Sequence, residues 1–360
     1  MKKYTENFEA GTKNLLLNCA QARPGDRVLL VGEQCDSPYF EPVLCDDVAQ
    51  VAQKLGIHAS AIMAEPVTDA SRFPHSVSDA MMNVDTTIFF SRLGDQVRFL
   101  DTPGSSKKIM CYTLTRKHMS SAFASVGFST MKNIHDLLIN EITAAKKYKI
   151  EAACGTSLSS EIVHDPGSNK SAVTEFSLEL FPVMIFPPVN FHNLHGQLVL
   201  KDFLLSSSTR AYEDSVLILD SPVIAQIENS CIVDFEGELT EIEQIKKQLE
   251  RAASISGGNA YQINSWHTGI NPYTFFEGDP YVDLERWGTV AYGSPRYTHI
   301  HAAGNDPGDI SIQLFDASIS FDSELFWDKG KFVFLDKPEV QALFNERGNI
   351  DSSTIRSIGL

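Results

Sequence analysis

The stretch Pro24-Gly25-Asp26-Arg27-Val28-Leu29-Leu30-Val31-Gly32 sets the fold of the first half of the chain. Its Pro-Gly-Asp start predicts a turn, and the apolar run that follows predicts a buried strand. Residues 4–22 before it have the spacing of an amphipathic helix. After it, a helix is expected over 39–55, with Gly56 as its stop, and a second strand over 57–63. This order of helix, strand, helix and strand predicts parallel strands with right-handed crossovers.

The same rhythm continues to about residue 148. Strands are expected at 84–91 and 109–113, and helices near 117–125 and 133–147. Residues 1–148 are therefore predicted to form an α/β domain. The segment contains no G-x-G-x-x-G and no G-x-x-x-x-G-K-[ST] motif, so it lacks the usual phosphate-binding loops.

The second half, residues 149–360, has a different pattern of short apolar runs separated by turns, which predicts an α+β domain with an antiparallel sheet. One helix is expected from Thr240, as N-cap with Glu243 three residues on, to about residue 254 before Gly257-Gly258. Strands are expected at 216–219, 223–227, 231–235, 260–266, 288–292, 297–302, 310–315, 318–322 and 331–335.

The composition limits the classes of partner. Of the 360 residues 43% are hydrophobic and 21% are charged, as in ordinary globular proteins. The net charge of −16 disfavours nucleic acid and anionic membranes as partners. No apolar run has the length of a membrane span, and the first residues are too polar for a signal peptide, so a cytoplasmic location is expected. The six cysteines are scattered without a C-x-x-C pair, which predicts free and mostly buried thiols.

Three histidines in the second half have the arrangement of metal ligands. His299 and His301 are two residues apart on a predicted strand, so their rings point to the same side. His267 ends another strand, just before the turn Gly269-Ile270-Asn271-Pro272. Two alternatives remain open: His267 caps its turn by bonding a backbone carbonyl, or the His299/His301 pair faces solvent on a hairpin.

Two further histidines, His192 and His195, lie in a stretch that we expect to be a loop between strands. A polar loop of this kind can present a proton donor or acceptor, so both are candidates for catalytic proton transfer. The alternative is that their rings only satisfy backbone groups of the loop.

Asp309 is the carboxylate best placed to join the histidines. It opens a predicted strand, whereas Asp306 precedes Pro307-Gly308 and is expected in a turn. Two imidazoles and one carboxylate with open positions suit non-heme Fe(II). The same set with a bound water suits zinc or another Lewis acid. The predicted cofactor is a divalent metal ion on His267, His299, His301 and Asp309, and these residues alone leave Fe(II), Zn and Co open.

The order of several short motifs resembles the aminopeptidase T-type metallopeptidases over roughly residues 10–335. That superfamily also includes Fe(II)-dependent 2,5-dihydroxypyridine dioxygenases, and it implies a homodimer. The motifs that carry the resemblance are 23–30, 153–158 near that family's "G-T-D-L", 193–197 near "N-L-P-G-G-E", 269–272 near "G-x-N-P" and 288–290 near "G-T-V-H".

The chain departs from the peptidase pattern at its metal ligands. Gln197 stands where the family has glutamate, Ala291 where it has histidine, and Asp309-Ile310-Ser311 where it has H-x-D. These residues cannot supply an anionic two-metal cage. The dioxygenase branch matches better at His267, because it has a histidine in the strand before "G-x-N-P".

These observations predict a metal-dependent enzyme, favoured as a non-heme Fe(II) ring-cleaving dioxygenase acting on a small hydroxylated aromatic or heteroaromatic compound. In this hypothesis His192 or His195 moves a proton as the ring opens. A second hypothesis is a metal-dependent aminopeptidase or amide hydrolase with a rearranged site. A third is a non-catalytic binding protein on the same fold.

Overall fold

The chain forms two compact units. The computed structural model describes the chain apart from residues 1, 103, 105, 164–171, 211–213 and 345–349. The first unit contains Met1–Asn133, Phe176–Met184 and Ser208–Ala211, and the second contains Ile134–Glu175, Ile185–Ser207 and Tyr212–Leu360. Residue 148, the boundary expected from the sequence, lies inside strand β5 (Lys147–Glu151) of the second unit.

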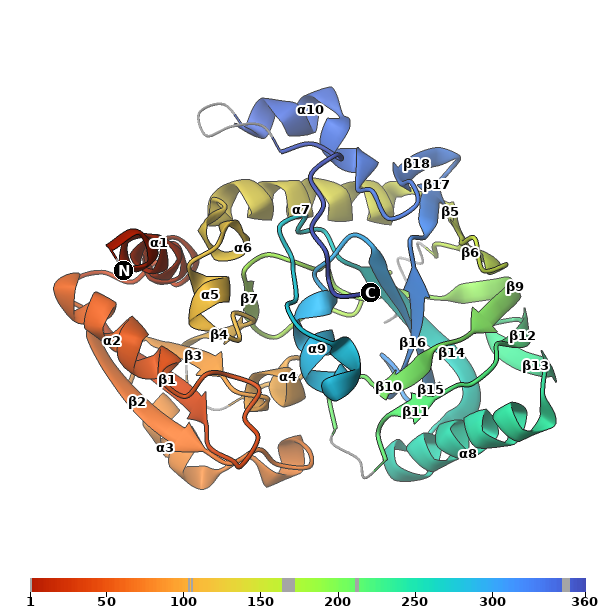
Figure 1. The fold of residues 1–360 in the computed structure, drawn as a ribbon, viewed down its shortest axis with the longest axis horizontal. Helices are drawn as coiled ribbons and strands as arrows, with labels where there is room; N and C mark the ends of the chain where they lie inside the picture. The colour runs from red at the N-terminus through yellow and green to blue at the C-terminus, as the bar shows by residue number, and fades with distance from the viewer. Residues whose placement is uncertain (1, 103, 105, 164–171, 211–213, 345–349) are drawn as a thin grey trace. The chain divides into compact units, whose positions relative to one another are not determined.

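The first unit is an α/β structure, as predicted. Its sheet contains, in spatial order, β2 (His58–Ala64), β1 (Arg27–Glu33), β3 (Thr86–Phe90), β4 (Lys107–Cys111) and β7 (Glu179–Phe181). All four pairings are parallel (Figure 1). Every residue of β1 after Arg27 is buried, which fits a central strand of a parallel sheet covered on both faces.

Short helices accompany this sheet. They are α1 (Lys2–Lys13), the π-helix η1 (Asn14–Cys19), α2 (Leu44–Lys54), η2 (Ala70–Arg72), α3 (His75–Met81), α4 (Leu93–Val97), α5 (Arg116–Met119) and α6 (Ala122–Ser125), while α7 (Phe128–Ala144) runs across the division at residue 133. In α2, Asp46 and Asp47 occupy the first turn and Lys54 the last, so these charges complement the helix dipole.

The second unit is built on a large antiparallel sheet, which confirms the predicted α+β class. In spatial order its strands are β11 (Leu217–Ile218), β10 (Phe203–Ser206), β16 (Ile310–Phe315), β15 (Tyr297–Gly304), β14 (Asn259–Thr268), β13 (Cys231–Glu236), β12 (Val223–Glu228), β9 (His192–Leu200), β6 (Ser157–Glu161), β5, β17 (Ser318–Phe321) and β18 (Glu324–Trp327), with β8 (Val189–Asn190) also pairing with β14.

The burial of the sheet changes along this order. Strands β5 and β6 alternate exposed and buried residues, as expected where one face meets solvent. In contrast, all eight residues of β15 and all but the last of β16 are buried. The three tryptophans of the chain, Trp266, Trp287 and Trp327, are also fully buried in this unit. The centre of the sheet is therefore covered on both faces.

The remaining elements of the second unit are helical. They are α8 (Leu239–Ser256), η3 (Pro280–Val282), α9 (Leu284–Ala291), η4 (Val333–Asp336), α10 (Pro338–Gln341) and η5 (Ala342–Phe344). Helix α8 packs against β14 and β15, and it ends at Gly257 with φ of 84°, as predicted for that glycine. Its N-cap is Glu238, so the N-cap predicted at Thr240 is wrong by two residues, and Thr240 lies inside the helix.

Three local predictions are wrong. The strand expected at 288–292 is part of helix α9, because the Asp283 side chain accepts a hydrogen bond from the Arg286 amide and starts a helix there. The strand expected at 331–335 is largely the 3-10 helix η4, and Phe332 and Phe334 are buried in an aromatic cluster instead of a ladder. The loop expected around His192 and His195 is the strand β9.

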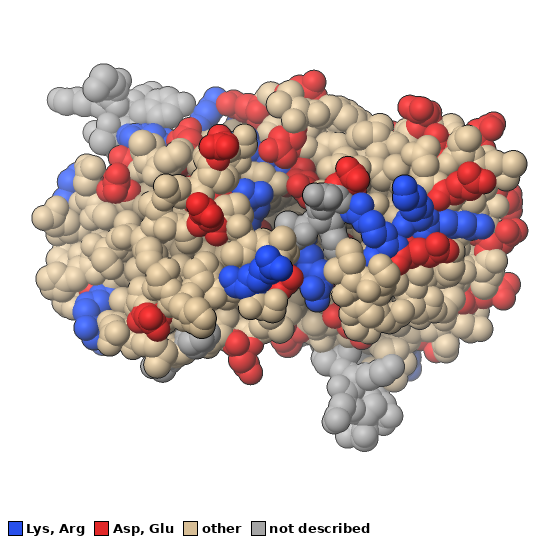
Figure 2. Space-filling model, turned by 90° about the horizontal axis from the view of Figure 1, so that it is seen from below, with Lys and Arg blue, Asp and Glu red and all other residues tan. Residues whose placement is uncertain are grey.

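All six cysteines are free, as predicted, with Cys19, Cys45 and Cys111 buried. No helix in the described part of the chain combines the length and the apolar character that a membrane span needs. Figure 2 shows one face of the molecule on which acidic side chains are scattered, with Lys and Arg side chains among them. On this face, the acidic side chains are spread out and do not form one continuous patch.

A buried ion pair lies at the carboxyl ends of β1 and β3, where the strand order of the first unit reverses. Sheets with this order bind ligands at that point. Here Glu33, the last residue of β1, accepts hydrogen bonds from the Arg92 amide (3.0 Å), Nε (2.9 Å) and Nη2 (3.1 Å). It also accepts one from the Tyr39 amide at 2.9 Å. The Glu33 side chain is fully buried, so these bonds replace its hydration.

We expect Glu33→Ala to lower the free energy of unfolding of the first unit by about 3 kcal/mol, because it leaves the partly buried Arg92 without its carboxylate. Chemical denaturation followed by circular dichroism measures this change. The control is Glu9→Ala, which removes an exposed ion pair with Lys13 and should change stability little. Equal effects of the two substitutions would contradict a structural role for the Glu33–Arg92 pair.

Candidate metal centre

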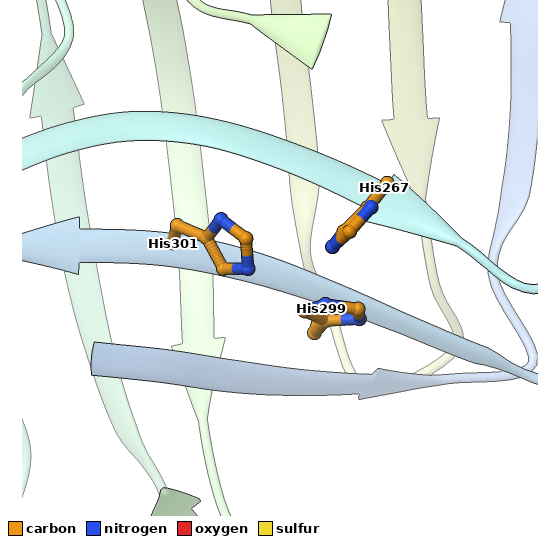
Figure 3. A group of neighbouring side chains, drawn as sticks. All are labelled: His267, His299 and His301. Atoms are coloured by element: carbon orange, nitrogen blue, oxygen red, sulfur yellow. The ribbon is translucent and has the colours of Figure 1, made fainter. Parts of the chain in front are cut away.

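The pairing of β14 with β15 brings three histidines together. His267 lies directly opposite His299, and Ser265 lies opposite His301. Directly opposed residues in an antiparallel pair share one face of the sheet. The ring centroid of His267 is 4.1 Å from that of His299 and 5.0 Å from that of His301. The centroids of His299 and His301 are 4.9 Å apart. Figure 3 shows the three rings gathered between the two strands.

The three rings are buried. The exposed fractions of His267, His299 and His301 are 3%, 2% and 0%. The alternative in which the His299/His301 pair faces solvent on a hairpin therefore does not hold. One potential ligand atom from each ring lies within 4.8 Å of the other two. No other set of three or more His, Cys, Asp or Glu side chains meets this criterion within the described residues.

Hydrogen bonds fix which nitrogen His267 can offer. Its Nδ1 lies 2.8 Å from the carbonyl oxygen of Phe186. A carbonyl only accepts, so Nδ1 carries the proton and donates it. The lone pair of the neutral ring is then on Nε2. This is the usual arrangement of a metal-binding histidine, in which an outer partner orients the ring and fixes its tautomer.

The same reasoning applies to His301 through Ser265. The Ser265 hydroxyl donates to the carbonyl oxygen of Pro307 at 2.8 Å, which uses its one proton. Its oxygen is 3.1 Å from His301 Nδ1 and must therefore accept a hydrogen bond from that nitrogen. His301 thus also holds its proton on Nδ1 and has its lone pair on Nε2. Two of the three imidazoles therefore present the lone pair of Nε2 as a possible metal ligand.

Aromatic rings surround His299. The centroid of its ring is 4.3 Å from that of Tyr292 and 5.7 Å from that of Tyr297. Burial raises the pKa of the Tyr297 hydroxyl well above its ordinary value, while the nearby Gln313 and Ser311 side chains oppose part of this rise. The hydroxyl is therefore a neutral hydrogen-bonding group at physiological pH.

Asp309 lies outside the histidine group. It is buried just before β16, and its backbone is tied by the bonds Asp309 N to Ala303 O and Ser207 N to Asp309 O, both 2.9 Å. Its carboxylate is not within 4.8 Å of the three ligand atoms together. The structure therefore gathers three of the four predicted ligands, and the metal-binding role of Asp309 stays a prediction.

The predicted proton-transfer residues lie on β9. His192 is partly buried, and the Ser160 hydroxyl donates to its carbonyl oxygen at 2.8 Å. His195 is exposed and lines a polar cavity of about 720 Å³, whose other lining residues include Lys149 and Glu161 but none of the three clustered histidines. A catalytic role for His192 and His195 stays a prediction, and His195 lines a cavity that does not include the three clustered histidines.

Two polar residues around the histidines, Ser265 and Gln313, were not identified from the sequence, and Ser311 was noted only as a departure from the H-x-D of the resembling family. Ser265 orients His301, while Ser311 and Gln313 lie directly opposite His301 and His299 on the neighbouring strand β16. A signal for the last two exists in the alternation Ile310-Ser311-Ile312-Gln313-Leu314. Alternation alone is typical of a half-exposed strand, so it does not distinguish solvent from a buried site.

The donors fit a single small metal ion. Zinc binds imidazole nitrogen at about 2.0–2.1 Å, so two ligands of one ion lie at most about 4.2 Å apart. The separations of up to 4.8 Å would require only small ring movements to reach that limit. Imidazole is a ligand of Zn, Cu, Fe and Ni, and three neutral imidazoles leave the ion with its full positive charge.

Comparison with known proteins supports the fold. No protein-family model matches the chain, and no curated protein matches it by sequence. A solved structure, that of 2,5-dihydroxypyridine dioxygenase from Pseudomonas putida KT2440, is similar with a TM-score of 0.58. The match covers 94% of this chain and 98% of that protein, at 12% sequence identity. The two chains therefore share an architecture over nearly their full lengths.

If the cluster is a metal site, His299→Ala should reduce the affinity for Zn²⁺ by more than about 100-fold, because it removes one of three ligands. Competition of the purified protein against a chromogenic chelator measures the affinity. His195→Ala is the matched control, since it removes an exposed imidazole from the same sheet and should leave the affinity unchanged. Similar affinities for wild type and His299→Ala would reject the site.

Ser265→Ala should weaken Zn²⁺ binding by about 10- to 100-fold, the usual effect of losing an outer partner of a ligating histidine. The substitution frees His301 to adopt the other tautomer. Ser320→Ala, on β17 of the same sheet, is the control and should have no effect. The chelator competition again supplies the readout, and an unchanged affinity in Ser265→Ala would mean that Ser265 does not set the His301 tautomer.

Proposed function

We propose that the protein is a metal-dependent oxygenase that acts on a small hydroxylated aromatic or heteroaromatic ring. In this proposal His267, His299 and His301 bind one divalent metal ion, with Fe(II) favoured. The single observation that supports it most is the convergence of three buried imidazoles from two adjacent strands. Proteins rarely bury so many ionisable rings together unless the rings have a common partner.

The charge of the donor set favours a particular kind of substrate. A bound Fe(II) ion would supply positions for molecular oxygen and for a chelating oxygen of the substrate. The three imidazoles are neutral ligands, and no carboxylate of a described residue belongs to their group. An anionic oxygen of the substrate, such as a ring phenolate, would therefore balance the ion's charge in the buried site.

The side chains around the site have defined tasks in this proposal. Phe186 O and the Ser265 hydroxyl hold His267 and His301 with Nε2 available. The rings of Tyr292 and Tyr297 limit the orientation of His299 and exclude water from it. A dry, preorganised ligand set strengthens electrostatic interactions within the site.

The similar solved structure gives independent support for the reaction class. That protein is a dioxygenase of a dihydroxypyridine, and its fold matches this chain over 94% of the length. Fold similarity alone does not transfer an activity. Here it coincides with a candidate metal site in the antiparallel sheet, and the two observations together favour oxygenase chemistry.

A hydrolase is the second candidate, favoured because the histidine group includes no Asp or Glu from the described part of the chain. Three imidazoles are also a zinc-binding set, and zinc held by neutral ligands activates a bound water. The third hypothesis, a non-catalytic binding protein, would gain if the rings were far apart. Their centroids are 4.1 to 5.0 Å from one another.

The decisive experiment combines metal analysis with oxygen uptake. Protein purified anaerobically should contain about one Fe(II) per chain, or should take up that amount when it is supplied. The loaded protein should consume oxygen with a hydroxypyridine or a catechol, and His299→Ala should lose both the iron and the uptake. Zinc- or cobalt-dependent release of amines from aminoacyl amides, without oxygen uptake, would instead support the hydrolase.

A further inference from the structure

A second set of polar side chains extends the histidine face onto β16. Ser311 is the cross-strand partner of His301, and Gln313 is the partner of His299. Since opposed residues share a face, both side chains lie on the side of the sheet that carries the histidines. Tyr297, two residues before His299 on β15, lies on this face too, near Ser311 and Gln313. We call Tyr297, Ser311 and Gln313 the polar shelf.

The polar shelf is buried without enough hydrogen bonds. The exposed fractions of Tyr297, Ser311 and Gln313 are 0%, 0% and 2%. Within the described part of the protein, the Tyr297 and Ser311 hydroxyls and both ends of the Gln313 amide are inaccessible and form no hydrogen bond of ordinary geometry. The Tyr297 hydroxyl interacts only weakly with the neighbouring Gln313 and Ser311 side chains. Buried polar atoms in native proteins almost always have partners, so a group from outside the chain is expected to supply them.

The chemistry of the polar shelf selects an uncharged partner. Gln313 can accept hydrogen bonds through Oε1 and donate through Nε2, and neither atom has a hydrogen bond of ordinary geometry. The two hydroxyls can donate or accept. Tyr297, Ser311 and Gln313 are themselves uncharged side chains, so the shelf offers no counter-charge to a charged ligand group.

A side-chain amide with both ends available matches another amide. Its carbonyl accepts from an N–H, and its NH₂ donates to a C=O on the same edge of the ligand, giving two parallel hydrogen bonds. A ligand that lacks either group would leave one end of Gln313 unpaired in the interior. Buried polar sites reject such ligands strongly, because the unpaired group loses its hydrogen bond to water without replacement.

We propose that the polar shelf binds the uncharged amide edge of a small ligand, a lactam or a carboxamide, and holds it beside the three histidines. Gln313 is then a specificity-determining residue, and Ser311 and Tyr297 support it. The inference rests on the proposed function in that it names the substrate class of the same site. It does not require that a metal be present, because none of its hydrogen bonds involves one.

The test uses three probes of similar size on the full-length protein. Benzamide has both an N–H donor and a C=O acceptor, acetophenone has only the acceptor, and benzoate is charged. Isothermal titration calorimetry is run after chelation and again with Zn²⁺ added. Benzamide should bind in both conditions. After chelation, when no ion can attract the carboxylate, it should bind at least about 10-fold more tightly than acetophenone or benzoate.

Gln313→Leu should lower the affinity for benzamide by at least about 10-fold, while Gln226→Leu on β12 serves as the matched control and should not change it. The melting temperature of Gln313→Leu should stay the same or rise, because an unpaired buried amide is replaced by an apolar side chain. A purely structural glutamine would instead lose stability on substitution, so this readout separates the two roles.

The outcomes separate this inference from the metal site. Benzamide binding that depends on Gln313 in a protein that takes up no zinc would keep the shelf and reject the metal-dependent function. Three results would overturn the ligand-binding role of the shelf. They are zinc binding without benzamide binding, equal benzamide binding by wild type and Gln313→Leu, and a lower melting temperature of Gln313→Leu. Equal affinities for benzamide and acetophenone would overturn the amide preference.

Discussion

The register between β14 and β15 is the constraint on which the candidate site depends. It places His267 opposite His299 and Ser265 opposite His301, and the next pairing adds Ser311 and Gln313 to the same face. Side chains alternate along a strand, so a slip of one residue would turn every one of these groups to the other side. Backbone pairing deep in the sheet, where β15 is buried throughout, therefore determines the chemistry.

Burial also determines how the imidazoles are presented. In water a histidine ring exchanges tautomers and rotates. Here the Phe186 carbonyl accepts a hydrogen bond from His267 Nδ1 at a fixed position. The Ser265 hydroxyl, which donates to the Pro307 carbonyl, accepts one from His301 Nδ1. The outer partners come from the backbone and from a serine that has no other proton to give. A ligand set oriented in this way needs little rearrangement on binding an ion, which is the general value of preorganised sites.

The sequence predicted what local periodicity controls. The buried strand at 27–32, the antiparallel second half and the common side of His299 and His301 all follow from alternation or apolar runs. The pairing of His267 with His299, 32 positions later, has no local signal, because register is set by tertiary packing. Helix α9 was predicted as a strand for a different reason: the local cap at Asp283 and the buried environment of its apolar face outweigh the β-branched Thr289-Val290.

The buried polar side chains on the histidine face also lower the stability of the fold. On the other side of the same strands, Ile300 and Ile312 are fully buried apolar partners, as expected where stability alone selects the residue. The histidine face instead buries imidazoles, hydroxyls and an amide, and apolar residues of similar volume would pack there without unpaired polar atoms. Local choices that work against stability are expected where a protein binds something. The unpaired polar side chains are gathered on one face of three adjacent strands. This arrangement favours a ligand-binding role for the face over a purely structural role in the core.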